Sequence, residues 1–110
     1  MNYRQEYEKW LASPALSEEE RAELKAIAND EKEIENRFYG PLEFGTAGLR
    51  GTMYVGLHNM NRHVIRWATQ GFANVIRAEG EAAMQKGVAI CMDCRNHSTE
   101  FAREAACVMA

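Results

Sequence analysis

Residues 42–51 read Leu-Glu-Phe-Gly-Thr-Ala-Gly-Leu-Arg-Gly, and this glycine-rich stretch separates two parts of the chain that differ in pattern. Its three glycines, and a fourth at Gly56, follow no helical period, so we expect residues 42–57 to form a loop with strand character. Helical periods precede this stretch, whereas strand and helical patterns alternate after it. The stretch therefore decides the expected fold.

Residues 1–40 are expected to form a helical N-terminal extension. Ser17 with Glu20, and Asp30 with Glu33, have the spacing of a helix-capping side chain and its partner one turn later. This region carries a net charge of −4, which we assign to the solvent-exposed sides of its helices. Apolar residues recur at helical spacing in three short segments: Tyr3, Tyr7, Trp10 and Leu11, then Leu24, Ile27 and Ala28, then Ile34 and Phe38.

Residues 41–110 are expected to form a truncated domain, because the chain stops on an apolar stretch with no returning strand. Val88–Met92 is a continuous apolar run, which is typical of a strand buried on both faces. The predicted fold class is therefore α/β, with the helical extension followed by an incomplete β-α-β-α portion, a mixed sheet flanked by helices. Two helical stripes are expected to face inward: Val64, Ala68, Gly71, Phe72, Val75 and Ile76, and then Phe101, Ala105 and Val108 on a last helix capped by Ser98.

The composition excludes several classes of protein. A formal net charge of −3 over 110 residues gives no electrostatic reason to expect nucleic acid or an anionic membrane as a partner. The longest apolar runs, Val88–Met92 and Ala105–Ala110, are too short to span a bilayer, and the first residues lack a secretory pattern. Three cysteines without a secretion signal indicate a reduced, cytoplasmic protein.

The stretch at residues 42–51 offers groups suited to a phosphate. Its glycine spacing fits neither a dinucleotide-binding fingerprint nor a Walker loop, but it exposes backbone N–H groups, the Thr46 hydroxyl and the forked guanidinium of Arg50. A plain glycine turn before a strand explains the same pattern equally well. Asp93 and Arg95 follow the expected second strand, where α/β proteins place functional groups, although a salt bridge that holds the turn also explains them.

Cys91 and Cys94 form a C-x-x-C pair at the end of that strand, which is the context of redox-active thiols. Together with Cys107 and His97 they could supply four zinc ligands, but the chain has no second closely spaced ligand pair. Small buried residues are the default interpretation of such cysteines. A thiol-redox or metal-binding protein therefore stays an alternative, as does a helical interaction module without chemistry.

The stretch at residues 42–51 resembles the opening active-site motif of the α-D-phosphohexomutases, in particular the branch of the phosphoglucomutases and phosphopentomutases. Later segments agree in order and spacing: Met60-Asn61, Arg66 with Gly71-Phe72-Ala73, and Asp93-x-Arg95 with Ser98. Three positions depart from the branch. His58-Asn59 stands where Asn-Arg is usual, Cys94 replaces serine or threonine, and Thr99 replaces proline.

The resemblance implies an intramolecular phosphotransferase that interconverts hexose 1-phosphate and hexose 6-phosphate through a phosphoserine and a sugar bisphosphate, with Mg²⁺ as cofactor and a phosphosugar as partner. It implies a phosphate-binding role for Arg50, with Gly45, Thr46 and Gly48 shaping the loop and Asp93 and Arg95 in support. The family's Ser-His-Asn-Pro loop is absent from these 110 residues, and so is its metal-binding loop. We therefore expect no catalytic or metal-binding residue in this chain and no activity by itself. Self-association as a dimer is expected for a separate reason, because truncation would leave an open edge on the Val88–Met92 strand and an uncovered apolar face on the last helix.

Overall fold

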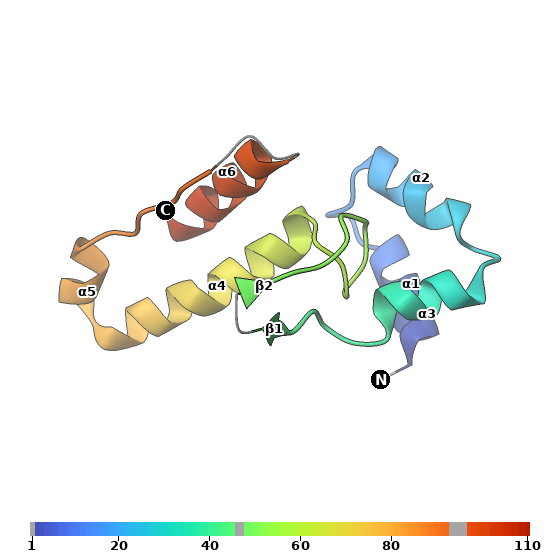
Figure 1. Cartoon of the computed structure of the whole chain (residues 1–110), viewed down its shortest axis with the longest axis horizontal. Helices are drawn as coiled ribbons and strands as arrows, with labels where there is room; N and C mark the ends of the chain where they lie inside the picture. Colours follow the sequence, from blue (N-terminus) through green and yellow to red (C-terminus); the bar gives the residue numbers. More distant parts are fainter. Residues whose placement is uncertain (1, 46–47, 93–96) are drawn as a thin grey trace. The chain divides into compact units, whose positions relative to one another are not determined.

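A computed structural model of the chain describes residues 2–45, 48–92 and 97–110. Within these ranges the chain forms six helices and one short pair of strands (Figure 1). It divides into two compact units, Met1–Asn61 and Arg62–Ala110. In chain order the elements are α1 (Tyr3–Leu11), α2 (Glu18–Ala26), α3 (Glu31–Phe38), β1 (Phe44–Gly45), β2 (Gly48–Leu49), α4 (Arg62–Glu79), α5 (Glu81–Gln85) and α6 (Ser98–Met109).

Helices α2 and α3 begin at the two capping side chains that the sequence predicted. The Ser17 hydroxyl accepts a hydrogen bond from the Glu20 N–H at 3.2 Å, and the Glu20 carboxylate accepts one from the Ser17 N–H at 3.0 Å. The Asp30 carboxylate accepts from the Glu33 N–H at 3.2 Å. Each cap satisfies a backbone donor that has no partner inside its helix, and so sets the residue at which the helix begins.

The core of the first unit lies among these helices. Leu24, Ile34 and Phe38 are fully buried, which confirms the inner faces expected from the helical periods. The Phe38 ring meets the rings of Tyr7 and Trp10 edge to face, at centroid distances of 5.8 Å and 5.6 Å. The buried Tyr7 hydroxyl donates to the Leu24 carbonyl oxygen at 2.8 Å, so its polar end is satisfied inside the core.

A surface ion pair also joins the first and third helices. Arg4 Nη1 lies 2.8 Å from Glu31 Oε1, and both side chains are well exposed to solvent. The Tyr3 hydroxyl donates to the other oxygen of Glu31 at 3.2 Å, and this hydrogen bond raises the pKa of Tyr3 above its usual value of 10.0. Exposed pairs of this kind contribute little to stability, so the buried aromatic cluster holds these helices together.

The segment after the third helix belongs to the same core. Val55 and Leu57 are buried in the cluster that contains Phe38, so the first unit extends to Asn61 and not only to Gly40. A compact unit is defined by packing, whereas the predicted division into residues 1–40 and 41–110 follows the change in charge and sequence pattern near Gly40. That division stays a prediction.

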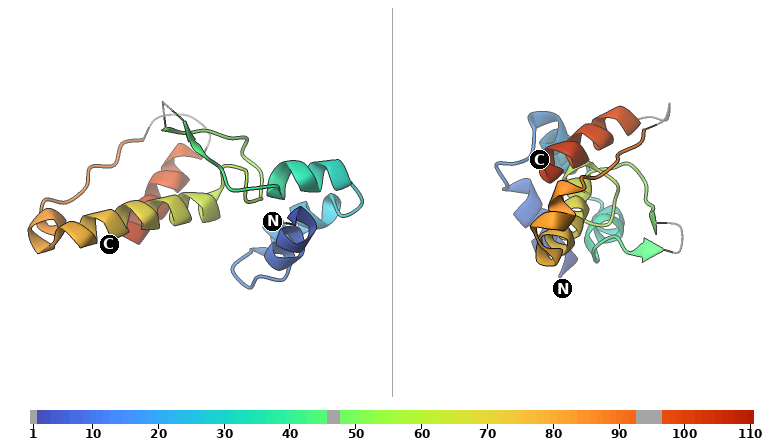
Figure 2. Two further views of the ribbon diagram at one scale, coloured as in Figure 1. Left: turned by 90° about the horizontal axis from the view of Figure 1, so that it is seen from below. Right: turned by 90° about the vertical axis from the view of Figure 1, so that its left-hand side faces the viewer.

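The second unit is built from α4, α5 and α6. Gly80, with φ of 105°, separates α4 from α5. Helix α6 packs along α4 (Figure 2), and Arg66 Nε of α4 lies 3.5 Å from Glu104 Oε2 of α6. Ser98 is the first residue of α6, and His97 occupies the capping position that was expected for Ser98. None of the described helices is both long and apolar enough to cross a membrane.

The predicted α/β fold is wrong. Val88–Met92 forms no strand, and the one strand pair among the described residues is antiparallel, with Phe44 opposite Leu49 and Gly45 opposite Gly48. A strand exists only where a neighbouring segment accepts and donates its hydrogen bonds, and no described segment pairs with Val88–Met92. The apolar composition of this run favours burial, but Val88, Ile90 and Met92 are exposed. The described fold is helical.

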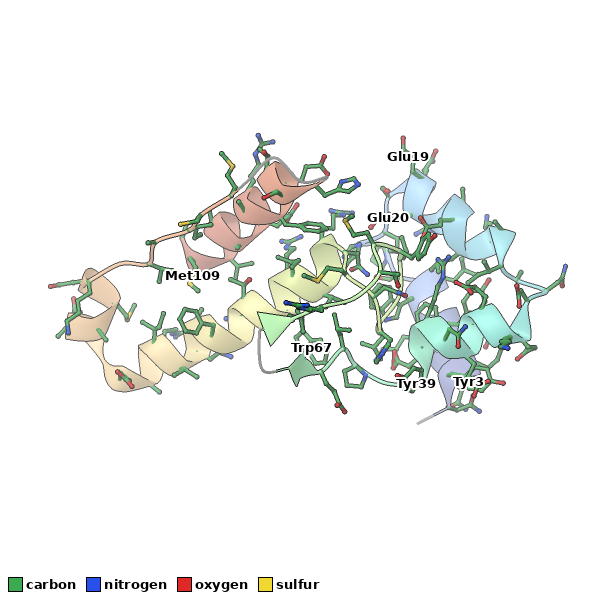
Figure 3. The ribbon with its side chains drawn as sticks, viewed as in Figure 1. Tyr3, Glu19, Glu20, Tyr39, Trp67 and Met109 are labelled. Carbon is green, nitrogen blue, oxygen red and sulfur yellow. The ribbon has the colours of Figure 1, made fainter. Side chains whose placement is uncertain are left out.

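The expected inward stripe of α4 is also only partly buried. Val64 is buried, whereas Phe72 and Val75 are more than half exposed. Trp67 on the same helix is 59% exposed and is labelled in Figure 3. Helix α6 covers one side of α4, and no other described segment of the second unit covers these apolar side chains. Exposed apolar surface of this extent on a small protein favours association.

The expected self-association of the chain remains a prediction, and it can be measured by sedimentation equilibrium. We expect the apparent mass to rise above the 12.5 kDa of one chain across micromolar concentrations, because association would remove Trp67, Phe72 and Val75 from water. Replacing Phe72 and Val75 by serine should weaken the association, whereas Asn74→Ser on the same helix should not. A mass that stays at 12.5 kDa at every concentration would contradict this expectation.

Candidate functional site

The predicted phosphate-binding stretch is folded back on itself by the short strand pair. Gly45 of β1 lies opposite Gly48 of β2, and Arg50 follows β2 directly. Thr46 lies outside the described residues, so its predicted contribution to the loop is not described. Arg50 is exposed and, among the residues that the structure describes, has no hydrogen-bond or ion-pair partner. Its guanidinium is therefore available to an anion from solution.

The segment that follows Arg50 is closed by two buried asparagines. The Asn59 side-chain nitrogen Nδ2 donates to the Thr52 hydroxyl at 3.0 Å, and the Met60 backbone N–H donates to the Thr52 carbonyl oxygen at 2.8 Å. The Asn61 amide nitrogen donates to the carbonyl oxygens of residues 54 and 56, at 3.0 Å and 2.9 Å. These bonds replace the backbone ladder that a loop lacks, and they hold the chain two residues beyond Arg50.

Gly56 is required at the tightest point of this loop. Its φ is 152°, a conformation that residues with a side chain rarely adopt. A methyl group there would lie 2.7 Å from Asn59 Oδ1, 2.8 Å from Arg37 Cβ and 3.0 Å from the Arg37 carbonyl oxygen. Asn59 Oδ1 is itself buried without a hydrogen-bond partner among the described residues. Gly56 thus allows the loop to approach α3 closely.

A cavity of about 510 Å³ lies between the C-terminal part of α3 and this loop, entirely within the first unit. Its volume is within the range of small-molecule sites. Glu33 and Arg37 in its wall are paired with each other at 2.8 Å, so Arg50 is the lining arginine that can meet a ligand's charge. The other polar lining residues that matter here are Asn36, Tyr39, Thr52, Tyr54 and His58.

His58 is a cavity residue that the sequence patterns did not single out. Its Nδ1 lies 3.0 Å from the Gly40 carbonyl oxygen, which can only accept, so Nδ1 carries the proton. Its Nε2 is hydrogen-bonded to the Tyr39 hydroxyl at 2.8 Å, and the two rings lie 4.3 Å apart between centroids. Tyr39, labelled in Figure 3, directly follows α3. No sequence pattern predicts these contacts, because His58 is 18 residues from Gly40 and 19 residues from Tyr39.

The remaining predicted site residues either lie outside the described residues or do not line this cavity. Asp93, Cys94 and Arg95 lie outside the described residues. Cys91 and Cys107 are exposed free thiols, so their interpretation as small buried residues is wrong. Within the part of the chain that is described, no group of three histidine, cysteine or acidic side chains could hold a metal ion.

Comparison with known proteins identifies the family. The family model described as Phosphoglucomutase/phosphomannomutase, alpha/beta/alpha domain I, matches residues 41–110. The phosphopentomutase of Homo sapiens is 38% identical over 109 residues, which cover 93% of this chain and 18% of that protein. The phosphoribomutase of Saccharomyces cerevisiae is 40% identical over 78 residues, covering 71% and 12%. The phosphomannomutase of Mycoplasma genitalium is 34% identical over 100 residues, covering 89% and 18%. No solved structure matches significantly.

The chain belongs to the phosphoglucomutase/phosphomannomutase family, which confirms the resemblance found at residues 42–51. It is thus related to phosphomutase enzymes. The chain spans less than a fifth of the length of these curated relatives. The matched region begins at residue 41 and contains Arg50 and the two buried asparagines, whereas α3, which forms the other wall of the cavity, precedes it.

The close approach at Gly56 can be tested by substitution. Gly56→Ala should lower the free energy of unfolding by about 2–4 kcal/mol, since it combines a disfavoured φ with a clash against Arg37. Gly71→Ala is a matched control, because a methyl group at Gly71 would meet no atom within 4 Å and alanine favours the helix by up to about 1 kcal/mol. Urea unfolding measures both. Equal effects of the two substitutions would refute the proposed close approach.

Proposed function

We propose that this chain supplies the phosphate-binding loop of a phosphohexomutase that interconverts hexose 1-phosphate and hexose 6-phosphate. The observation that carries the proposal is Arg50, an exposed arginine without a described partner at a cavity of about 510 Å³, inside the region that matches the family. The names of the relatives refer to pentose, ribose, mannose and glucose phosphates. A phosphosugar is the ligand common to them.

The chemistry of phosphoryl transfer explains why an arginine is needed. Negative charge develops on the oxygens of the phosphoryl group that moves, and a positioned cation lowers the energy of that state. The planar guanidinium of Arg50 can donate two parallel hydrogen bonds to one phosphate, which fixes its orientation as well as its charge. The loop behind Arg50 is already closed by Asn59 and Asn61, so little further ordering is required when the phosphate binds.

The uncharged polar side chains that line part of the cavity suit the sugar part of such a ligand. Asn36, Thr52 and Tyr54 offer amide and hydroxyl groups that can exchange hydrogen bonds with sugar hydroxyls. The acidic wall residue Glu33 is already bound to Arg37 at 2.8 Å, which reduces its repulsion of a phosphate. Together these residues favour a small polar ligand with one anionic end.

The phosphoserine and Mg²⁺ implied by the resemblance are not assigned to these 110 residues. The serines are Ser13, Ser17 and Ser98, and none is followed by His-Asn. The described residues contain no metal-ligand group either, so they do not fit a bound Mg²⁺ and we derive no step through it. What this chain contributes, in our proposal, is the binding and orientation of the phosphate.

The role of Arg50 can be measured in an assembled enzyme, in which these residues are joined to the remaining length of a family member. Arg50→Ala should lower kcat/KM for glucose 1-phosphate 100- to 1,000-fold, about 3–4 kcal/mol, because one cationic contact to the moving phosphate is lost. Arg50→Lys should recover only part of the loss, since a point charge cannot bind in the forked geometry. Arg4→Ala removes an exposed arginine far from the loop in sequence and serves as the control. Near-normal activity of Arg50→Ala would contradict the proposal.

The 110-residue chain by itself should show no conversion of glucose 1-phosphate to glucose 6-phosphate in a coupled assay. The reason is chemical, since it has no serine in the sequence context from which the family donates its phosphoryl group. The assembled enzyme is the positive control, and it should also be offered mannose 1-phosphate and ribose 1-phosphate. Turnover by the isolated chain above background would show that residues within it suffice for catalysis.

A further inference from the structure

Arg37 on α3 is a buried arginine, with only 6% of its surface exposed. Its Nε donates to Glu33 Oε1 at 2.8 Å, and its Nη1 donates to Glu23 Oε2 at 2.9 Å and to the Val55 carbonyl oxygen at 3.3 Å. Burying a guanidinium costs several kcal/mol, and the attraction to its partners often does no more than offset that cost. Stability alone therefore does not explain why this ion pair is buried.

The reason lies in what the Glu23–Arg37 pair holds. The carboxylate oxygen of Glu23 that binds Arg37 also accepts from the Val55 N–H at 2.7 Å. The Arg37 carbonyl oxygen accepts from the His58 N–H at 2.8 Å. The Arg37 guanidinium also stacks on the Tyr54 ring, 4.6 Å from its centroid. Glu23 and Arg37 thus bind the N–H and the carbonyl oxygen of Val55, respectively. The Arg37 carbonyl oxygen also binds the N–H of His58.

Hydrogen bonds join these loop residues to Thr52, which lies close to Arg50 in the chain. The Asn59 N–H donates to the Gly56 carbonyl oxygen at 3.2 Å, and the Asn59 side chain donates to the Thr52 hydroxyl at 3.0 Å. Thr52 also receives the Met60 N–H at its carbonyl oxygen, at 2.8 Å. Thr52 is two residues beyond Arg50, so a displacement of the loop at Val55 reaches the backbone that carries Arg50.

We infer that Glu23 and Arg37 are positioning residues that hold the loop of Arg50 in the conformation that receives a phosphate. This inference rests on the proposed function of Arg50. It gives the helices of residues 1–40 a role in the site, although they precede the matched family region and contain no residue of the predicted motif. Glu23 and Arg37 act through the loop backbone, and neither is required to touch the ligand.

The inference can be tested on the 110-residue chain with inorganic phosphate as the probe. Glu23→Ala removes the acceptor of the Val55 N–H, and Glu23→Gln keeps an acceptor but removes the charge that faces Arg37. Glu31→Ala is the matched control, because it removes the carboxylate of an exposed ion pair that does not contact the loop. Two quantities are measured by NMR: amide hydrogen exchange at Val55, His58 and Phe38, and the phosphate-dependent shifts of residues 50–52.

We expect Glu23→Ala to accelerate exchange at Val55 and His58 by about 10-fold or more, with little change at Phe38, since local opening of the loop would become easier. The dissociation constant for phosphate should rise about 3- to 10-fold, Glu23→Gln should lie between wild type and Glu23→Ala, and Glu31→Ala should match wild type. If Glu23→Ala does not fold, the same comparison is made with Glu23→Gln.

Three results would overturn the inference: unchanged exchange at Val55, equal acceleration at Val55 and Phe38, or faster loop exchange with unchanged phosphate affinity. Equal acceleration would mean that Glu23 only stabilises the whole unit. If the wild-type chain shows no phosphate-dependent shift at residues 50–52, the proposed function fails instead. In that case, the exchange rates at Val55 and His58 alone show whether Glu23 holds the loop.

Discussion

The burial of the Arg37 guanidinium is the constraint on which the first unit depends. A buried charge is tolerated only when its donors are satisfied, and here the acceptors come from three separate places: Glu33 on the same helix, Glu23 on α2 and the Val55 carbonyl oxygen in the loop. The helices and the loop must therefore assemble together. The core around Phe38, which includes Val55, supplies the apolar burial that offsets the cost of enclosing this charge.

The two arginines at the cavity have opposite environments, and this difference separates their roles. Arg37 is surrounded by acceptors from the protein, so its charge is already neutralised and cannot also serve a ligand. Arg50 is exposed and has no described partner, so its charge remains available. A site for an anion needs such a division, because a loop held by its own binding residue would lose its anchor each time the ligand arrived. His58 and Tyr39 extend the anchoring by joining the end of α3 to the same loop.

The second unit shows that an apolar sequence pattern does not by itself establish burial. Val88–Met92 has the composition of a buried strand, and α4 has an apolar stripe at helical spacing, yet Ile90, Phe72 and Val75 are exposed. Composition reports what a segment would gain from burial, whereas burial itself requires a second surface. Helix α6 provides that surface for one side of α4, and no other described segment of the second unit provides it for the rest. The family match over residues 41–110 is independent of this packing, since it is carried by residue identity.

The sequence by itself determined the local structure and the family. The caps at Ser17 and Asp30, the inner faces at Leu24, Ile34 and Phe38, and the motif at residues 42–51 each depend on residues a few positions apart, within reach of one helical turn or one loop. Only the tertiary structure decided that Glu23 binds the Val55 N–H across 32 positions, that His58 meets Tyr39, and that Val88–Met92 forms no strand. Contacts of that range depend on which surfaces the folded chain brings together, and no periodicity in the sequence records them.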